Sequence, residues 1–266
     1  MASILDSMLD AAIAASRAIL KVYAEPFETR LKEDGSPVTE ADAAAEAIIL
    51  EILRPTGIPS LAEESVAAGR LPELGDRFFV IDALDGTKEF IKRNGEFTVN
   101  IALCERGRPV LGVVLAPVTG ALYWGGPQGA FAARAAAGVI VDRRPIEVST
   151  AGPLHIVASR SHRQAVLETL CEELGVVRDL SVGSSLKFCL LAEGRAQLYP
   201  RFGPTSEWDT AAGQAVLEAA GGVVVRLDGA PLDCGHREND FLNPVFIAAA
   251  SSDLARRTIE IARHLL

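Results

Sequence analysis

The segment Asp82-Ala83-Leu84-Asp85-Gly86-Thr87 carries the strongest chemical signal in this chain. It follows the apolar run Arg77–Ile81, which predicts a buried strand, so two carboxylates and a hydroxyl should gather at the end of that strand. Hard cations such as Mg²⁺ bind carboxylates together with water and phosphate oxygens. Asp82 and Asp85 could each face a separate ion, with the carbonyl of Leu84 between them. The alternative is an ordinary Asp-Gly turn that joins two strands.

Two further acidic sites could complete a metal site. Glu63 and Glu64 end a short apolar stretch that begins at Leu61, and Glu207-Trp208-Asp209 opens a predicted helix. Each has a simpler explanation, because paired glutamates are often solvated loop charges and an aspartate at a helix start is often an N-cap. Neither site by itself would indicate metal binding.

Two other helix starts carry groups suited to a water nucleophile or an anion. Thr39-Glu40-Ala41-Asp42 has the spacing of a capping box, in which Thr39 and Asp42 satisfy free N–H groups, and this role is compatible with catalysis. Ser184-Ser185-Leu186-Lys187 follows Gly183 at the start of another predicted helix. The free N–H groups of that helix start and the ammonium of Lys187 would suit an anion.

Composition restricts the kind of partner. Of the 266 residues, 49% are hydrophobic, which is enough for one large domain or two modest lobes with real cores. The 26 Lys and Arg against 35 Asp and Glu give a net charge of −9, so binding to a nucleic-acid polymer is not expected. A phosphorylated small molecule could still bind through metal cations that lie between it and the carboxylates. The four cysteines form no Cys-x-x-Cys pair, which argues against a zinc site or a disulfide framework.

Hydrophobic periodicity assigns the first half of the chain to helices and then to strands. Met1–Tyr23 predicts an amphipathic helix that is neither a signal peptide nor a membrane span, so we expect a cytoplasmic protein. A second helix should begin at Thr39 and stop at Pro55. The first strand should end at Asp82. Further strands are expected at about 97–103, 110–115, 121–124 and 130–133, with the spacing of an antiparallel meander.

Beyond about Thr150 the pattern alternates between strand and helix. Strands are expected near Ile156, Leu198, 223–225 and 246–250, and helices near 162–174, 184–193, 209–220 and 252–265. We therefore predict a layered α+β and α/β sandwich, with an antiparallel-sheet lobe over residues 1–150 and a mixed-sheet α/β lobe over residues 151–266. The first lobe would carry most of the carboxylates that could bind metal, and the second would carry Asp209 and the anion-binding candidates at 184–187, so that the two lobes together form one unit.

Taken together, these segments resemble the inositol monophosphatase and fructose-1,6-bisphosphatase superfamily of metal-dependent phosphatases. Its signatures are a Glu-Glu pair, an Asp-x-x-Asp-Gly-Thr turn and a Trp-Asp pair that opens a later helix, and all three occur here in that order. From about Ala12 to Gly222 the chain is most similar to the CysQ-type 3′(2′),5′-bisphosphate nucleotidases. The similar segments are 37–42, 84–103, Ser159-Arg160-Ser161-His162, 183–189, 198–201 and 207–212, and the Thr-Lys-Glu-Phe sequence at 87–90 is specific to that subgroup.

Two positions depart from the subgroup pattern. Ala83 stands where the family usually has Pro, which loosens the turn without removing a ligand atom. Residues 63–69 are more similar to the inositol monophosphatase version of this loop. The resemblance therefore leaves the choice between nucleotide and inositol phosphates open.

By matching position, the resemblance assigns roles to individual residues. It implies that two or three Mg²⁺ ions are bound by the side chains of Glu63, Asp82, Asp85 and Asp209 and by the carbonyl of Leu84. It implies catalytic roles for Glu63, Asp42 and Thr87, the last two positioning or activating the attacking water. Substrate contacts are expected from Asp85, Gly86, Thr87, Lys88, Ser184, Ser185, Lys187 and Asp209, whereas His162 is better explained as structural.

The implied activity is hydrolysis of the 3′-phosphate of adenosine 3′,5′-bisphosphate to AMP by metal-activated water. The sulfated relative of this nucleotide would be a further substrate, which implies a place in sulfur metabolism, and lithium inhibition is typical of the superfamily. The alternatives are an inositol monophosphatase, a broad sugar-phosphate phosphatase, or a noncatalytic sensor of phosphorylated metabolites. Four converging carboxylates disfavour a sensor, because they repel one another without metal.

Overall fold

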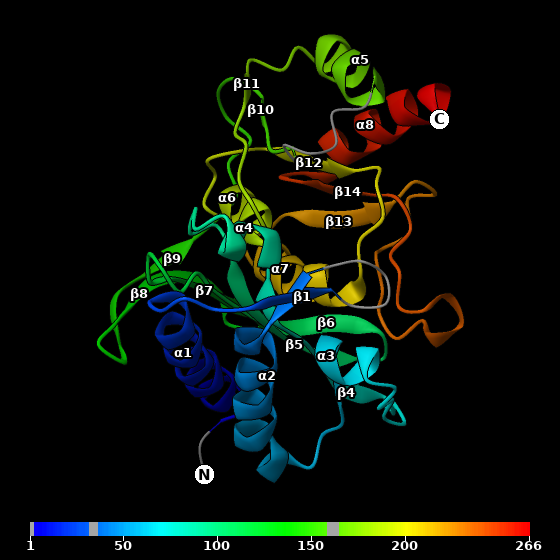
Figure 1. The fold of residues 1–266 in the computed structure, drawn as a ribbon. Helices are drawn as coiled ribbons and strands as arrows, with labels where there is room; N and C mark the ends of the chain where they lie inside the picture. Colours follow the sequence, from blue (N-terminus) through cyan, green and yellow to red (C-terminus); the bar gives the residue numbers. More distant parts are fainter. Residues whose placement is uncertain (1–2, 32–36, 159–164) are drawn as a thin grey trace.

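Alternating layers of helix and sheet make up the computed structural model, which describes residues 3–31, 37–158 and 165–266 (Figure 1). Helices α1 (Ile4–Tyr23) and α2 (Glu40–Leu53) cover one face of a seven-stranded sheet. Helices α6 (Leu186–Ala192) and α7 (Glu207–Ala219) lie between this sheet and a five-stranded sheet. Helices α5 (Ala165–Leu174) and α8 (Ser252–Leu265) pack outside the second sheet. The predicted layered α+β fold is confirmed.

The seven-stranded sheet is an antiparallel meander with one parallel edge strand. Its order is β3-β4-β5-β6-β7-β8-β9, and β3 pairs parallel with β4. The meander was predicted, but its last strand was not, because most side chains of β9 are exposed and give no alternation. The strands are β3 (Ser60–Ala62), β4 (Arg77–Asp85), β5 (Thr98–Glu105), β6 (Arg108–Leu115), β7 (Ala121–Gly126), β8 (Gly129–Ala136) and β9 (Val139–Ile146).

Strand β4 is buried on both faces of its sheet. Phe78 and Val80 belong to the hydrophobic cluster on the α7 side, whereas Phe79 and Ile81 belong to the cluster under α1 and α2. Successive side chains of a strand point to opposite faces, which explains why this segment reads as a continuous apolar run. Two packed cores therefore hold the strand that leads to the candidate metal ligands.

The prediction that this strand ends at Asp82 was wrong, because β4 runs to Asp85. Asp82 pairs with Asn100 and Asp85 with Thr98 on β5, and the register shifts between these pairs. At this irregularity, three residue steps on β4 are matched by two on β5, and both Asp82 and Asp85 stay in the strand. Gly86 then takes a left-handed conformation (φ 93°) and α4 (Thr87–Ile91) begins. Glycine adopts this conformation without a Cβ penalty.

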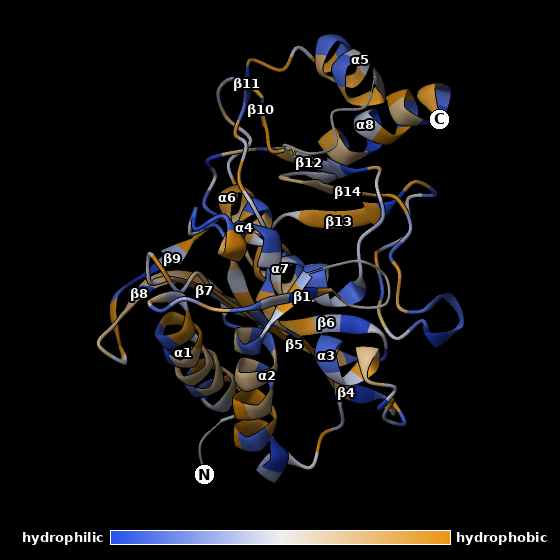
Figure 2. Ribbon diagram, viewed as in Figure 1, coloured by the Kyte–Doolittle hydropathy of each residue, from blue (hydrophilic) through white to orange (hydrophobic). Residues whose placement is uncertain are grey.

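Helices α1 and α2 begin at well-defined caps. Ser3 and Asp6 form a capping box at α1, and Thr39 and Asp42 form the predicted capping box at α2. Both helices bury one face against the sheet, and Figure 2 shows hydrophobic and hydrophilic residues alternating along them, as expected for helices half exposed to solvent. The caps and the apolar faces together fix the position of Asp42.

The five-stranded sheet is mixed, in the order β11-β10-β12-β14-β13. Strands β10, β11 and β12 pair in parallel, and β14 pairs antiparallel with β12 and β13. The strands are β10 (His155–Ile156), β11 (Arg178–Asp179), β12 (Leu198–Arg201), β13 (Val223–Arg226) and β14 (Phe246–Ala249). The remaining elements are the pair β1 (Thr29–Leu31) and β2 (Pro37–Thr39), the short helix α3 (Glu63–Ala67), and two 3₁₀ turns at Arg54–Thr56 and Arg237–Asn239.

Helix α7 packs directly on the first sheet although it comes from the second half of the sequence. A Cβ built on Gly112 of β6 would lie 2.2 Å from the carbonyl oxygen of Ala212, and one on Gly125 of β7 would lie 2.6 Å from the Cα of Val216. Only glycine allows this close approach of strand and helix. The approach brings the start of α7, with Asp209, toward the end of β4.

Candidate active site

Three carboxylates that are distant in sequence meet at the end of β4. Asp82, Asp85 and Asp209 each offer one oxygen, and these oxygens all lie within 4.8 Å of one another. Asp82 is buried, and its Oδ1 accepts a hydrogen bond from the backbone N–H of Leu84 at 2.9 Å. Three of the four acidic side chains predicted to bind metal are therefore brought together.

Protein donors fix one oxygen of Asp85. Its Oδ2 accepts hydrogen bonds from the N–H of Ser185 at 2.7 Å, from the hydroxyl of Ser185 at 3.1 Å and from Nδ2 of Asn100 at 3.3 Å. Nδ2 of Asn100 also lies 2.8 Å from the hydroxyl of Ser185. This network ties β4 and β5 to the start of α6 and fixes the orientation of the Asp85 carboxylate.

Asp209 is held by the start of its own helix. Its Oδ2 accepts hydrogen bonds from the N–H of Ser206 at 2.9 Å and from the hydroxyl of Thr205 at 2.6 Å. The N-cap of α7 is Ser206, so the sequence-based alternative that Asp209 is itself an N-cap was wrong. The neighbouring Glu207 is fully buried, and its carboxylate accepts hydrogen bonds from the N–H groups of Gly235 and His236. Capping the helix and facing the other carboxylates are compatible roles for Asp209.

Glu63 lies beside this cluster and outside the 4.8 Å group. It follows β3 directly, and Ala62 of that strand pairs with Ile81 of β4, so Glu63 comes level with Asp82. Its charge is one of those that raise the pKa of Asp82. Glu64, the second member of the predicted pair, is engaged through its backbone N–H with Glu46.

A hydroxyl and a carboxylate form a pair next to the cluster. The hydroxyl of Thr87 donates a hydrogen bond to Oδ1 of Asp42 at 3.1 Å and lies 3.4 Å from the carbonyl oxygen of Leu84. Oδ2 of the buried Asp42 accepts hydrogen bonds from the N–H and the hydroxyl of Thr39, both at 2.8 Å. The capping box of α2 thus orients the carboxylate that holds Thr87.

Burial and crowding of negative charge shift the acidity of the cluster. Burial, with the charges of Glu63, Asp85 and Asp209, raises the pKa of Asp82 well above its ordinary value. Burial, followed by the charge of Asp209, raises the pKa of Asp85 to about 6. These carboxylates resist ionising together without a cation, and a divalent cation relieves both causes.

A cavity of about 280 Å³ adjoins the carboxylate cluster. Its charged lining residues are the acidic Asp85, Glu89, Glu96 and Asp209 and the cationic Lys88, Lys187 and Arg201. Its lining includes Asp85, Gly86, Lys88, Ser184, Lys187 and Asp209 from the predicted substrate set, but not Thr87 or Ser185. Nζ of Lys187 donates to the carbonyl oxygen of Ser184 at 2.8 Å, and burial lowers the pKa of Lys187. The buried hydroxyl of Ser184 has no hydrogen-bond partner among the described residues. The cavity thus places an unused hydroxyl and positive charge near the acidic cluster.

Sequence reasoning missed Arg201 and Asn100 as site residues. Arg201 lines the cavity from the end of β12, and its guanidinium also donates to the carbonyl oxygens of Gly203 and Pro204. Asn100 is fully buried in β5, and its Oδ1 makes no hydrogen bond to a described residue. An amide within an apolar strand was the available signal, because buried polar groups need partners. The segment Ser159-Arg160-Ser161-His162 lies outside the described residues.

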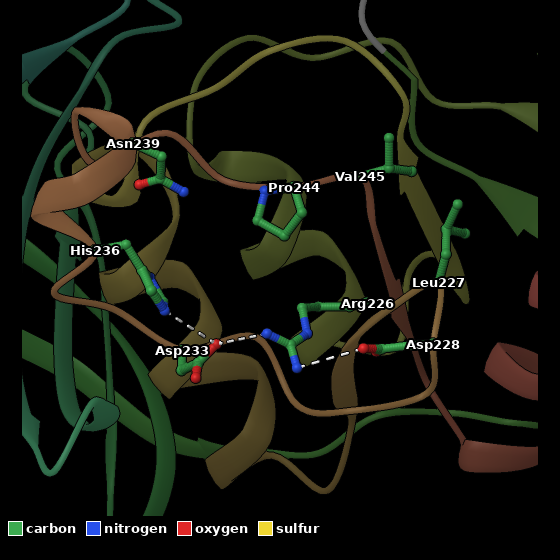
Figure 3. A pocket seen from close by; sticks show the side chains of 8 residues that line it. All are labelled: Arg226, Leu227, Asp228, Asp233, His236, Asn239, Pro244 and Val245. Carbon is green, nitrogen blue, oxygen red and sulfur yellow. Dashed lines mark hydrogen bonds and ion pairs between the residues drawn. The ribbon is translucent and has the colours of Figure 1, made fainter.

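A second cavity, of about 460 Å³, has different chemistry (Figure 3). Arg226 lies between Asp228 and Asp233, 3.4 Å from each, and Nε2 of His236 lies 3.7 Å from Asp233. The protein itself balances the guanidinium there, so no excess positive charge faces the cavity from these groups. Of these two cavities, only the first is lined by candidate metal ligands, so it is the better candidate for a phosphorylated ligand that binds through a cation.

Comparisons with known proteins agree with this geometry. The model of the inositol monophosphatase family matches residues 2–266. The chain belongs to the inositol monophosphatase family. Within that family, it is 52% identical over 236 residues to the 3′(2′),5′-bisphosphate nucleotidase CysQ of Salmonella typhimurium. The matched residues cover 87% of this chain and 94% of that protein. It is 49% identical to the protein of the same name from Escherichia coli K12, over 91% of this chain and 98% of that protein.

Solved structures of the inositol monophosphatase family share the fold. The crystal structure of CysQ from Bacteroides thetaiotaomicron superposes with a TM-score of 0.78 at 40% identity, covering 92% of this chain and 96% of that one. The inositol monophosphatase of Thermotoga maritima superposes with a TM-score of 0.77 at 22% identity, over 98% and 96% of the two chains, and shows the fold alone. Enzymes of the family are metal-dependent, and the three convergent carboxylates are oxygen ligands of the kind that such a metal binds.

Across residues 3–31, 37–158 and 165–266, no helix has the length and the apolar character needed to cross a bilayer.

Proposed function

We propose that this chain is a magnesium-dependent phosphatase that converts adenosine 3′,5′-bisphosphate to AMP by removing the 3′-phosphate. The observation that carries the proposal is a single cavity lined by two of the clustered carboxylates, Asp85 and Asp209. The cationic side chains of Lys187 and Arg201 line the same cavity. Such a cavity suits a ligand with two phosphates, one at the metal site and one at the cations. The names of the relatives that are about 50% identical support the same substrate.

The proposed metal ligands are the side chains of Asp82, Asp85, Asp209 and Glu63 and the carbonyl of Leu84, which would hold two or three Mg²⁺ ions. When bound, the ions would neutralise phosphate charge and lower the pKa of water. The carboxylates supply hard oxygen ligands from three elements, β4, α3 and α7. Ser185 and Asn100 would keep Asp85 oriented during turnover.

Thr87 and Asp42 are the proposed proton-handling pair. The Thr87 hydroxyl already donates to Asp42, so its oxygen lone pairs are available to accept a hydrogen bond from the attacking water. As the water attacks phosphorus, its proton passes to Thr87 while the proton of Thr87 passes to Asp42, so the pair acts as a general base. Product phosphate leaves with the former water oxygen, and the nucleoside 3′-oxygen leaves with a proton from solvent.

Three other residues of the cavity lining would bind the 5′-phosphate and the nucleoside. Lys187 and Arg201 would supply positive charge, and Ser184 would supply a buried hydroxyl that has no hydrogen-bond partner among the described residues. Gly86 and Lys88 also line the cavity and lie within three residues of Asp85, so a scissile phosphate would approach the backbone there. The sulfated relative of the substrate fits the same scheme, because its 3′-phosphate has the same surroundings. A role in sulfur metabolism and a cytoplasmic location belong to this proposal.

A side-by-side turnover assay tests the proposal. Phosphate release would be measured from adenosine 3′,5′-bisphosphate, 3′-AMP, inositol 1-phosphate and a sugar phosphate, each with Mg²⁺ and with chelator. We expect the bisphosphate to have the highest kcat/KM and to require Mg²⁺. Faster turnover of inositol phosphate would assign the chain to the inositol monophosphatase activity instead.

The Asp85→Asn variant separates an enzyme from a noncatalytic sensor. An enzyme loses most of its rate because a metal ligand is removed, whereas a sensor that binds its anion without metal binds it equally well or better when a negative charge is lost. Equilibrium binding of adenosine 3′,5′-bisphosphate in chelator, measured beside turnover, distinguishes the two. Undiminished binding to the variant together with no turnover by the wild-type chain would favour the sensor.

A further inference from the structure

Glu46 is a buried carboxylate that binds the start of a different helix. It lies in α2 and is 3% exposed. Its Oε2 accepts a hydrogen bond from the backbone N–H of Glu64 at 2.7 Å, and its Oε1 accepts one from the hydroxyl of Ser65 at 2.6 Å. Both bonds are short and charge-assisted, which marks them as strong. Both oxygens of Glu46 are therefore committed to α3.

Helix α3 needs this support because it has no cap of its own. It spans only Glu63–Ala67, and its N-cap residue, Ala62, makes no side-chain capping bond. The first N–H groups of a helix lack partners inside the helix and must find them elsewhere. Glu46 supplies one of these partners from α2. It thereby fixes the backbone directly after Glu63.

The same face of α2 carries a second buried carboxylate. Asp42 lies four residues before Glu46, which is about one helical turn, and both are 3% exposed. Asp42 holds Thr87 beyond the end of β4, whereas Glu46 holds the segment that follows Glu63 at the end of β3. Helix α2 therefore contacts the site at two places: at Thr87, which follows β4, and at Glu64, which follows β3 and Glu63.

We propose that Glu46 is a positioning residue that fixes Glu63 against Asp82 and so sets the affinity of the site for its divalent cation. The proposal rests on the proposed metal-dependent function. Partners of metal ligands typically change metal affinity by about 10–100-fold when they are removed. Because Glu46 contacts α3 and not the substrate cavity, its loss should alter the metal requirement much more than the KM for nucleotide.

The test compares Glu46→Gln with Glu51→Gln in the full-length chain. Glu51 lies on the same helix, but its side chain is 68% exposed and pairs with Arg54. For each protein, the thermal midpoint would be followed against Mg²⁺ alone, and phosphate release against Mg²⁺ at saturating nucleotide. We expect Glu46→Gln to raise the half-saturating Mg²⁺ concentration by about 10-fold or more in both titrations, with KM for nucleotide changed less than about 2-fold. Glu51→Gln should match the wild type.

A graded variant covers the case in which Glu46→Gln does not fold. Ser65→Ala removes one of the two bonds to Glu46 and leaves the backbone bond, so we expect a shift of about 3-fold in the same direction. A variant that lowers the metal-free midpoint and leaves the Mg²⁺ response unchanged shows a purely structural role and overturns the inference. A wild-type chain that responds to Mg²⁺ but hydrolyses no adenosine bisphosphate overturns the proposed substrate, while the thermal titration still tests Glu46.

Discussion

Replacing Asp85 with Asn should stabilise the metal-free protein while abolishing its response to metal. The raised pKa of Asp85, about 6 against an ordinary 3.8, means that ionising this carboxylate in the folded state is costly. At about 1.4 kcal/mol for each unit of pKa, a difference in pKa of about 2 corresponds to about 3 kcal/mol. The amide makes weaker hydrogen bonds than the carboxylate to Ser185 and Asn100, which reduces the expected net gain to about 1–2 kcal/mol.

The pH dependence gives the prediction its sign. The folded state keeps the Asp85 proton to a higher pH than the unfolded chain does, so the metal-free wild type loses stability as the pH rises from about 4 to about 6. Asn carries no such proton. The advantage of Asp85→Asn should therefore be absent below about pH 4 and complete above about pH 6. Asp82, whose pKa is also raised, contributes a destabilisation of the same sign in both proteins.

Thermal unfolding in chelator and then in Mg²⁺ measures both effects. For a chain of this size, about 1–2 kcal/mol corresponds to a midpoint higher by about 2–8 °C at pH 7.5 in chelator. Mg²⁺ should raise the midpoint of the wild type and leave that of Asp85→Asn nearly unchanged. Asp10→Asn, at an exposed position of α1, is the matched control and should behave as the wild type. A variant less stable than the wild type at pH 7.5 in chelator would refute the reasoning.

Three further predictions follow from individual contacts. Thr87→Ala should lower kcat by about 100-fold with little change in KM, measured as phosphate release, because the hydroxyl that hands a proton to its carboxylate partner is lost; a mainly raised KM would contradict this role. Lys187→Met should raise KM for adenosine 3′,5′-bisphosphate by about 10-fold or more and leave 3′-AMP almost unaffected, since only the former carries the 5′-phosphate; equal effects on both nucleotides would refute it. Gly112→Ala should lower the free energy of unfolding, measured in urea, by about 3 kcal/mol, because its Cβ would meet the carbonyl oxygen of Ala212 at 2.2 Å. Gly75→Ala is the control and should be neutral, because a Cβ at that position would meet no atom within 4 Å.

Local patterns in the sequence were sufficient for one helix cap and for most strands. The capping box at Ser206 was missed. The capping box at Thr39 was predicted from residues three apart, because such short-range chemistry is visible in the sequence alone. Apolar alternation located the meander from β4 to β8 for the same reason. The prediction failed at β9, where exposed side chains give no pattern, and at the end of β4, where a shift in register against β5 extends the strand to Asp85.

The candidate metal ligands were found from motifs, but the shape of the site was not. The sequence by itself determined which carboxylates could serve, because Asp82 and Asp85 follow a buried strand and Asp209 opens a helix. Only the tertiary structure decided that Ser185 donates to Asp85 across 100 residues, and that Arg201 shares the cavity. It also decided that Glu46 holds the chain next to Glu63 from another helix. Such contacts arise from how layers pack, through interfaces like that of Gly112 against α7, and no short-range pattern in the chain encodes which distant groups will meet there.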